Sequence, residues 1–512
     1  NLNYIPAYIN MAETLNNLGK FAEAINVYNK VIRIKPDLAI IYYNLANLQK
    51  KINLNKDAIN NFKKTLEINP YFADAHYNLA NTYSNLGEMY LAYLSYEKAI
   101  KLSPGNPKFH SNKLLNLNYD PNLTAEFIFE QHKLFDKQFS YLNKNKNFKN
   151  ILKTKKNKLR IGYVSPDFRR HSVAYFFEAL LKNHNKNLVE TFCYYNNHIV
   201  DDTTKRLQTY SKNWRTIFNL DDKEVITIIR NDKIDILVDL CGHMAGNRLL
   251  IFASKSAPIQ VTYLGYPNTT GLSAIDYRLT DEYTDPTNSS VLFYSEKLIK
   301  LNRCFLCYSG NDKYTVSKSF PLHKNNFITF GSFNSFKKIN SNVVNIWSNI
   351  LRSIPNSKLI LKNSESFSDD NLMIEKFISA GVNKDNIKFM SKKPDRNDHM
   401  NLYNNIDIAL DTFPYNGTTT TFEALWMGVP VITLSGNNHM CRVSSSILKN
   451  LNLSNFIAHN INDYQKIAIK MHEKKEYLIQ LKKGLRKQLK LSSLCDGKSF
   501  AHEVEEKFFK LL

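Results

Sequence analysis

One loop of the sequence points directly to chemistry, because four consecutive threonines follow a glycine there. The loop Asp411–Thr421 comes after an apolar run and leads into the apolar stretch Phe422–Met427, which predicts a strand, a turn and a helix. Gly417 permits a tight turn. The threonine N–H groups and hydroxyls would then lie at a helix N-terminus, where unpaired donors and the helix dipole favour a diphosphate. A well-capped helix is the alternative interpretation, but capping needs only one threonine.

Two charged side chains extend this predicted phosphate site. Glu423 lies one turn into the predicted helix, where its carboxylate could accept hydrogen bonds from ribose hydroxyls. Lys338 directly follows another predicted strand, and a lysine there would offset the charge of a leaving phosphate. The sequence contains no Gly-rich P-loop, no GxGxxG after a strand and no clear DxD pair. These features together predict a nucleotide-diphosphate site that needs no metal ion.

The elements that would position these residues are predicted to form two parallel-sheet lobes, because apolar runs alternate with amphipathic helical stretches. The first lobe has the predicted strands Leu159–Val164, Val189–Tyr195, Ile234–Leu240, Ile259–Leu264 and Tyr277–Leu279. The second lobe has the predicted strands Phe327–Gly331, Lys358–Leu361, Ile387–Met390, Ile406–Leu410 and Val429–Leu434. The lobe boundary is expected near Ser319–Asn326, and ligands of such sheets bind beyond the C-terminal strand ends.

The N-terminal part of the sequence has a period of 34 residues. This spacing relates Pro36, Pro70 and Pro104, and it also relates the sets Ala24, Ala58, Ala92 and Tyr28, Phe62, Tyr96. The pattern is typical of tetratricopeptide repeats, in which a small alanine allows close helix packing and the proline ends the second helix. Three repeats are therefore predicted from Ile5 to Pro104.

A column of asparagines follows the same period at Asn10, Asn44 and Asn78. These residues occupy the first helix of each predicted repeat, which normally lines the concave face of the superhelix. Because an amide both donates and accepts, such a column could bind the backbone of an extended acceptor peptide without reading its sequence. The alternative is that the column only reflects a chain that is rich in asparagine throughout.

The formal net charge of +22 raises the question of nucleic-acid binding. The lysines are scattered among asparagines, and only Lys144–Lys158, where a linker is predicted, is dense. A solvated basic face is the preferred interpretation, so no nucleic-acid partner is expected.

Cysteine usage and hydropathy favour a cytoplasmic protein without a membrane partner. Six cysteines without regular spacing argue against a disulfide framework, and the pair Cys304 and Cys307 lacks a second ligand pair for zinc. No run of about 18 apolar residues predicts a membrane span. Because the first residue is Asn1 rather than Met, the sequence is expected to begin inside a longer one.

Several further motifs occur in a fixed order. They are Gly162–Phe168 followed by His171–Phe176, then Asp239–His243, Leu264–Gly271, Gly331–Asn334 and the threonine loop. With the repeats in front of them, these motifs resemble the SPINDLY and O-GlcNAc transferase family, closest to its SPINDLY-like branch. The resemblance extends over nearly the whole chain.

The resemblance implies an all-α tetratricopeptide superhelix followed by a two-lobed α/β glycosyltransferase of the GT-B type, with two Rossmann-like lobes. The expected domains are the repeats at 1–105, a helical linker at 106–157, an N-terminal catalytic lobe at 158–320 and a C-terminal nucleotide-sugar lobe at 321–512. The implied activity is inverting transfer of GlcNAc from UDP-GlcNAc to Ser or Thr of proteins, without a metal ion or other cofactor.

The resemblance also assigns roles to individual residues. His171 would be the histidine near the reacting centre, a candidate general base, and Lys338 the lysine that neutralises the donor phosphates. His399 would lie beside the nucleotide base, and Gly265 would give the sugar a backbone contact. The remaining donor-binding candidates are Ser335, Thr418, Thr419, Thr420 and Glu423, and His243 is an additional candidate.

Two departures from the animal O-GlcNAc transferase pattern leave alternatives open. Thr418 stands where those enzymes have a histidine, and Leu402 where they have an arginine; both resemble the SPINDLY branch, whose plant members use GDP-fucose. Protein O-fucosylation is therefore the first alternative. Glycosylation of asparagine is another, although the enzymes that do this typically lack such repeats. A catalytically inactive peptide-binding scaffold is the alternative from another class.

Overall fold

A computed structural model describes residues 4–143, 158–287, 291–318, 320–362, 367–391 and 393–512. Residues 144–157, which hold most of the basic run in the predicted linker, lie outside the described residues. Ser319, at the predicted lobe boundary, also lies outside them. The described chain forms two compact units. One unit draws on residues 1–120, 335–348 and 361–392, and the other on 121–334, 349–360 and 393–512. Helical repeats followed by two α/β lobes are confirmed as the fold class.

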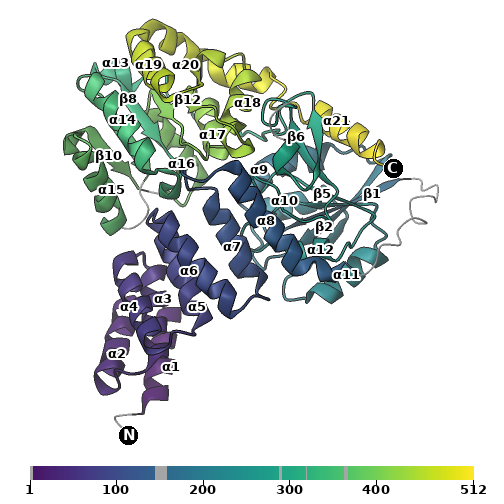
Figure 1. Cartoon of the computed structure of the whole chain (residues 1–512). Coiled ribbons are helices and arrows are strands. Elements are labelled where there is room, and N and C mark those ends of the chain that lie inside the picture. The colour runs from purple at the N-terminus through teal and green to yellow at the C-terminus, as the bar shows by residue number, and fades with distance from the viewer. Residues whose placement is uncertain (1–3, 144–157, 288–290, 319, 363–366, 392) are drawn as a thin grey trace. The chain divides into compact units, whose positions relative to one another are not determined.

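The repeats are antiparallel helix pairs, drawn in purple and blue in Figure 1. Their helices are α1 (Ile5–Asn17), α2 (Phe21–Ile34), α3 (Ala39–Lys51), α4 (Asn55–Ile68), α5 (Ala73–Asn85), α6 (Met89–Leu102) and α7 (Pro107–Leu117). The periodic alanines Ala24, Ala58 and Ala92 are fully buried, as close helix packing requires. Each pair turns through a left-handed residue, Gly19, Asn53 or Gly87, and these residues keep the period of 34.

The first sheet has seven parallel strands in the order β3-β2-β1-β4-β5-β6-β7. The strands are β1 (Leu159–Ser165), β2 (Val189–Tyr195), β3 (Asn213–Thr216), β4 (Ile236–Asp239), β5 (Ile259–Thr262), β6 (Tyr277–Asp281) and β7 (Lys297–Leu301). The helices of this part are α8 (Ala125–Phe139), α9 (Ser172–Asn183), α10 (Asp202–Gln208), α11 (Asp222–Asn231) and α12 (Leu249–Ala253).

The second sheet has six strands in the order β10-β9-β8-β11-β12-β13. The strands are β8 (Thr329–Ser332), β9 (Lys358–Lys362), β10 (Ile387–Met390), β11 (Ile408–Leu410), β12 (Val431–Leu434) and β13 (Ile457–Ala458). The helices are α13 (Pro321–Asn325), α14 (Ser341–Ser353), α15 (Phe367–Ser379), α16 (Arg396–Asn401), α17 (Thr419–Trp426), α18 (Val443–Lys449), α19 (Ile461–Glu473), α20 (Lys475–Leu491) and α21 (Gly497–Phe509).

The last helix, α21, returns to the first sheet and packs against α9. A buried hydrogen bond marks this contact, since His184 Nδ1 lies 2.7 Å from Glu505 Oε1. Glu505 also accepts a hydrogen bond of 2.9 Å from the backbone N–H of Asn185. The C-terminal segment therefore ties the second lobe to the first.

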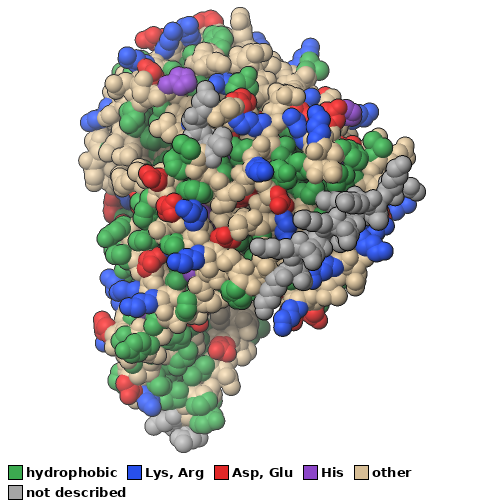
Figure 2. Space-filling model, turned by 45° about the vertical axis from the view of Figure 1, so that its right-hand side comes forward, with side chains coloured by type: hydrophobic (Ala, Val, Ile, Leu, Met, Phe, Trp, Pro, Cys, Tyr) green, Lys and Arg blue, Asp and Glu red, His purple; other side chains and the backbone are tan. Residues whose placement is uncertain are grey.

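Charged side chains on the face drawn in Figure 2 are interspersed, with Lys and Arg beside Asp and Glu. Within the described parts of the chain, every helix is too short or too polar to cross a membrane.

Candidate donor-binding site

The threonine loop is shaped by Asp411, which is buried directly after β11. Its Oδ1 accepts hydrogen bonds from the backbone N–H of Thr412 at 2.9 Å and of Gly417 at 2.6 Å. Its Oδ2 accepts from the Thr433 hydroxyl on β12 at 2.7 Å. A Cβ at Gly417 would lie 2.6 Å from Thr420 Oγ1, so only glycine fits this turn. The carboxylate thus holds the loop in one conformation.

Helix α17 begins at Thr419, inside the threonine run as the sequence predicts. Thr418 occupies the N-cap position but its hydroxyl makes no capping hydrogen bond, so capping does not explain the run. Thr420 instead donates from Oγ1 to Asn334 Oδ1 at 2.8 Å. Thr418, Thr419 and Thr420 are half-buried, and the first N–H groups of a helix have no acceptor in its own backbone. This helix end therefore presents donors of the kind that bind phosphate.

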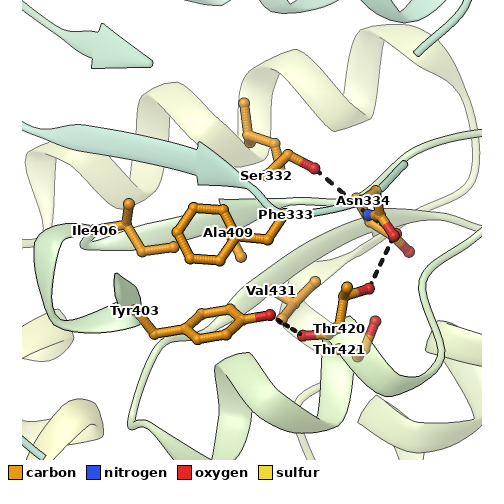
Figure 3. Close-up of a pocket in the computed structure, with 11 residues that line it drawn as sticks. Ser332, Phe333, Asn334, Tyr403, Ile406, Ala409, Thr420, Thr421 and Val431 are labelled. Atoms are coloured by element: carbon orange, nitrogen blue, oxygen red, sulfur yellow. Dashed lines mark hydrogen bonds between the residues drawn. The ribbon is translucent and has the colours of Figure 1, made fainter. Parts of the chain in front are cut away.

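A pocket lies beneath this helix end (Figure 3). Asn334, which follows β8, and Thr420 meet at one side of it, and the Tyr403 hydroxyl points toward the backbone carbonyl of Thr420. The other lining residues are Ser332, Phe333, Ile406, Ala409, Leu410, Asp411, Thr421 and Val431. The pocket thus opens at the C-terminal ends of β8 and β11, where ligands of open α/β sheets bind.

Glu423 is the electrostatic centre of the site and is almost fully buried. Its carboxylate accepts from Arg396 Nη1 at 2.6 Å, from His399 Nε2 at 2.9 Å and from the Tyr403 hydroxyl at 2.8 Å. Burial alone would raise the pKa of Glu423, but these three partners outweigh it and lower the pKa to about 2. His399 and Glu423, which were predicted separately as donor-binding residues, are brought together, and the carboxylate is ionised at neutral pH.

Arg396 connects this cluster to the first sheet. Its guanidinium lies over the ring of Tyr175 on α9, 4.4 Å from the ring centroid. Arg170, just before α9, also donates to the Pro394 carbonyl at 3.4 Å. The beginning of α9 therefore lies beside the beginning of α16, which carries Arg396 and His399.

His171 is the N-cap residue of α9 and is partly exposed. Its Nδ1 lies 3.3 Å from the backbone N of Val173 and 3.5 Å from Asp167 Oδ2. Burial lowers the pKa of His171, so the imidazole is neutral at pH 7. If Nδ1 donates to Asp167, Nε2 is left unprotonated and can accept a proton; if Nδ1 accepts from Val173, Nε2 carries the proton instead.

The loop Leu264–Gly271 contains Gly265 and is packed without spare room. Leu264 has a positive φ of 71°, which is strained for a residue with a side chain, and a Cβ at Gly265 would collide with the carbonyl of Leu240. His243 is fully buried and its Nε2 lies 2.8 Å from the carbonyl oxygen of Thr270. The structure thus places His243 as a support of this loop rather than at an open surface.

Ser335 and Lys338 belong to the unit that contains the repeats. They form the short helix η3 (Phe336–Lys338) and its N-cap, in which the Lys338 N–H donates to the Ser335 carbonyl at 2.9 Å. This turn packs against α5. The chain joins it directly to Asn334, which lines the pocket of the other unit.

The asparagine column is used, in part, by contacts within the repeats. Asn78 donates from Nδ2 to the Tyr43 hydroxyl at 2.9 Å, and its Oδ1 accepts from Lys50 Nζ at 2.8 Å. Asn112, which the sequence analysis did not single out, repeats the first contact with Tyr77 at 2.7 Å. Asn44 is half-buried and Asn10 is exposed. The column therefore continues into α7, one helix beyond the predicted repeats.

The cysteines form no disulfide bonds. All six are free thiols. Across the described ranges there is no cluster of three or more His, Cys, Asp or Glu side chains that could hold a metal ion.

Three residues of the site were not predicted as functional: Asp167, Arg396 and Asn334. Asp167 precedes His171 by four residues, which was the available signal. Arg396 and Asn334 gain their importance from partners 27 and 86 residues away, Glu423 and Thr420, and no local pattern reveals such contacts.

Comparisons with known proteins define the class of protein. The profile of glycosyl transferase family 41 matches residues 124–319 and 311–504, and tetratricopeptide-repeat profiles match residues 13–53, 39–72 and 73–106. The chain therefore belongs to glycosyl transferase family 41.

Relatives within the family carry more specific names. The chain is 38% identical over 402 residues to a tomato (Solanum lycopersicum) protein named "Probable UDP-N-acetylglucosamine--peptide N-acetylglucosaminyltransferase SPINDLY", which covers 77% of this chain and 43% of the relative. A barley (Hordeum vulgare) protein of the same name is 38% identical over 407 residues, with 78% and 43% covered. The chain thus spans less than half the length of these relatives.

A solved structure is similar over almost its whole length. An O-GlcNAc transferase mutant of Thermobaculum terrenum superposes with a TM-score of 0.88 at 30% identity, covering 99% of this chain and 97% of that one. The resemblance to the SPINDLY and O-GlcNAc transferase family is confirmed by these findings.

Proposed function

We propose that the protein is an inverting protein O-glycosyltransferase that moves GlcNAc from UDP-GlcNAc to Ser or Thr hydroxyls. Membership of family 41 and the names of its relatives support the donor and the acceptor class. The observation that carries the proposal lies at the N-terminal end of α17. Thr418 makes no capping hydrogen bond there, and the ionised Glu423 cluster lies one turn further along the helix. Phosphate would bind the first feature and ribose or base the second.

The donor would be held by two loops of the second unit, the threonine loop and the loop Leu264–Gly271. The N–H groups and hydroxyls of Thr418–Thr420 would bind the diphosphate, His399 would lie beside the base, and Gly265 would contact the sugar. Both oxygens of Glu423 already accept hydrogen bonds in this structure, so a ribose hydroxyl would have to share or replace one of those donors. Lys338 and Ser335 would complete the phosphate site, and the cation of Lys338 would stabilise the departing UDP.

The transfer would be a single in-line displacement. The acceptor oxygen attacks the anomeric carbon on the face opposite UDP, and the bond between that carbon and the phosphate oxygen breaks. UDP leaves with the electron pair, and the proton of the hydroxyl passes to His171 Nε2. This step requires the tautomer in which Nδ1 donates to Asp167, so we propose Asp167 as the residue that orients the base. No metal ion or other cofactor takes part in this scheme.

Acceptor proteins would lie along the repeats, with the asparagine column Asn10, Asn44 and Asn78 contacting their backbone. Asn10 is exposed and Asn44 is half-buried, and neither would have to give up a hydrogen bond of the kind that Asn78 makes. Asn78 would first have to give up its bonds to Lys50 or Tyr43.

The test is binding of UDP-GlcNAc and of GDP-fucose to the purified protein, followed by mass analysis of a mixed protein acceptor. Selective UDP-GlcNAc binding with a gain of one HexNAc mass is the expected result. A gain of one deoxyhexose from GDP-fucose would replace the proposed donor. Binding of neither donor would contradict the proposal and favour a peptide-binding scaffold.

A further inference from the structure

A buried polar network joins the two sheets of the second unit. His439 lies in the short helix η6 (His439–Cys441), which follows β12, and its Nδ1 is 2.7 Å from Asp285 Oδ2. Asp285 follows β6 of the other sheet and also accepts from the hydroxyls of Thr280 at 2.5 Å and Tyr294 at 2.9 Å. Both Asp285 and His439 are almost completely buried. Because a carboxylate only accepts, Nδ1 of His439 carries the proton and Nε2 is an acceptor.

Arg278 on β6 occupies the other side of the imidazole. Its Nη2 lies 3.3 Å from His439 Nε2 and donates at 2.8 Å to the carbonyl of Tyr266. Its Nη1 donates at 2.6 Å to the carbonyl of Asn268. The guanidinium therefore contacts both His439 and the loop Leu264–Gly271, at two successive points of that loop.

This loop needs such support because its backbone is strained. Leu264 is held at a positive φ, and strain of this kind costs about 1–3 kcal/mol and persists only where neighbouring groups over-determine the conformation. A small pocket lies beside the network and is lined by Pro267, Asn268 and His439, among others. The loop thus faces this pocket on one side and depends on the buried side for its position.

The helix η6 also reaches the threonine loop. The backbone N–H of Asn416 donates to the carbonyl of Met440 at 3.0 Å. Two further contacts join the same region to the end of β6, since Ser446 donates to Asp281 at 2.8 Å and Arg442 Nη1 to the Thr284 carbonyl at 3.4 Å. One short helix is therefore bonded directly to the threonine loop and, through Arg278, connected to the loop Leu264–Gly271.

We infer that His439, with Asp285 and Arg278, is a positioning residue that fixes the loop Leu264–Gly271 relative to the threonine loop. The inference rests on the proposed function insofar as that loop is taken to contact the donor sugar. Asp285 sets the tautomer of His439, the unprotonated Nε2 fixes Arg278, and Arg278 holds the two loop carbonyls. Burial lowers the pKa of His439, which keeps Nε2 unprotonated at neutral pH.

We call the contacts from Asp285 through His439 to Arg278 the relay. Two amide substitutions distinguish this relay from a simpler role in which His439 only donates a hydrogen bond to Asp285. His439→Gln can place an oxygen near the position of Nε2 and so keep an acceptor for Arg278. His439→Asn can place a donor near the position of Nδ1 and so keep the bond to Asp285, but it is too short to reach Arg278. Hydrogen exchange of the amides in residues 264–271, UDP affinity and sugar transfer are measured for both variants and the wild type.

The relay predicts that His439→Asn speeds exchange in residues 264–271 and lowers kcat, each by about tenfold or more, as expected for losing a hydrogen bond to a charged group. His439→Gln should stay within about threefold of the wild type by the same reasoning. UDP affinity should be unchanged in both, because no residue of the network lines the pocket beneath α17. A larger defect in His439→Gln than in His439→Asn, or unchanged exchange in His439→Asn, would overturn the relay.

The exchange readout also separates the two proposals. A wild-type protein that transfers no sugar from either donor removes the proposed function, while loop exchange still decides whether the relay exists. Normal transfer and normal exchange in His439→Asn would leave the proposed function intact and remove the relay.

Discussion

The repeats and the donor loop both present a run of uncharged polar side chains at regular spacing, and the structure treats the two runs differently. In the repeats, the Asn78 amide is engaged by Tyr43 and Lys50. In the donor loop, Thr418 makes no capping bond and α17 begins with backbone donors that its own helix cannot satisfy. Polar side chains with a similar sequence pattern thus stabilise the fold in the repeats, whereas in the donor loop they leave donors available for a ligand.

The difference follows from where the partners come from. A repeat supplies its own partners, because the residue one period away always lies next to it; Asn78 meets Tyr43 and Asn112 meets Tyr77, each 35 residues back. The donor loop draws its partners from separate strands, as with Asp411 after β11 and Asn334 after β8. Long-range contacts can leave a chosen group unpaired, whereas in the repeats an asparagine has the same partner wherever a tyrosine stands 35 residues before it.

The largest expected effect comes from neutralising the donor cluster with Glu423→Gln. Arg396 would be left buried beside a neutral amide, and breaking a buried ion pair typically costs about 3–5 kcal/mol in the free energy of unfolding. Urea unfolding at pH 7 measures this change. The exposed pair Lys64–Glu67 gives the matched control, since Glu67→Gln should leave the midpoint unchanged.

The same substitution predicts a pH dependence. The folded protein lowers the pKa of Glu423 to about 2 from an ordinary value of 4.5, so its contribution to stability is fully present above about pH 4.5 and is lost as the pH falls toward 2. The stability difference between wild type and Glu423→Gln should therefore shrink over that range. A difference that is constant from pH 5 to pH 2.5 would mean that the carboxylate is not held ionised.

Lys338→Met tests the role that is proposed for the Lys338 cation in stabilising the leaving group. Removing one group that stabilises the leaving charge typically costs about 10²–10³ in kcat. Steady-state donor turnover measures the loss, and Lys337→Met is the matched control because it makes the same change one residue away in the same turn. Normal turnover by Lys338→Met would remove Lys338 from the mechanism, and equal losses in both variants would indicate a disturbed turn instead.

Asp167→Asn asks which tautomer His171 adopts. If Nδ1 donates to Asp167, kcat should fall by about 100-fold, the lower end of the contribution of a single general base. The Asp167 carboxylate raises the pKa of His171, so its loss should move the acidic limb of the pH–rate profile to lower pH. An unchanged profile with a loss below threefold would show that Nδ1 accepts from Val173 and that another group takes the proton.

The sequence allowed the fold class and ten strands to be predicted, and the missed strands share a physical cause. They are β3 (Asn213–Thr216), β7 (Lys297–Leu301) and β13 (Ile457–Ala458), and each lies at the edge of its sheet. Inner strands of a parallel sheet are covered on both faces and read as apolar runs. The edge strands β3 and β7 are partly exposed, and β13 has only two residues, so no apolar run marks these three strands.

For the site, the motifs predicted which loops carry functional residues, but they did not predict which side chains of these loops contact one another. His399 and Glu423 were predicted separately and lie 2.9 Å apart, with Arg396 added from outside both motifs. His243 was a candidate site residue, yet its imidazole is buried against Thr270. Which polar groups face a ligand is decided by packing between distant segments, and this information is not local in the sequence.

The smallest effect is expected for Asn44→Ala and Asn78→Ala. These two substitutions test what the asparagines of the repeats do. If the asparagine column binds acceptor peptides, both changes should weaken peptide transfer more than donor hydrolysis. Asn78→Ala should also cost stability, about 1 kcal/mol for each lost hydrogen bond to Tyr43 or Lys50.

Asn112→Ala is the matched control for this stability effect, because it loses the equivalent bond to Tyr77 outside the three predicted repeats. Transfer to peptides and donor hydrolysis are measured together with the thermal midpoint for all three variants. Equal losses of transfer and hydrolysis would show that the column only joins successive repeats. A selective loss of transfer in Asn44→Ala, without the stability loss of Asn78→Ala, would assign acceptor binding to the copy whose amide the neighbouring repeat does not take up.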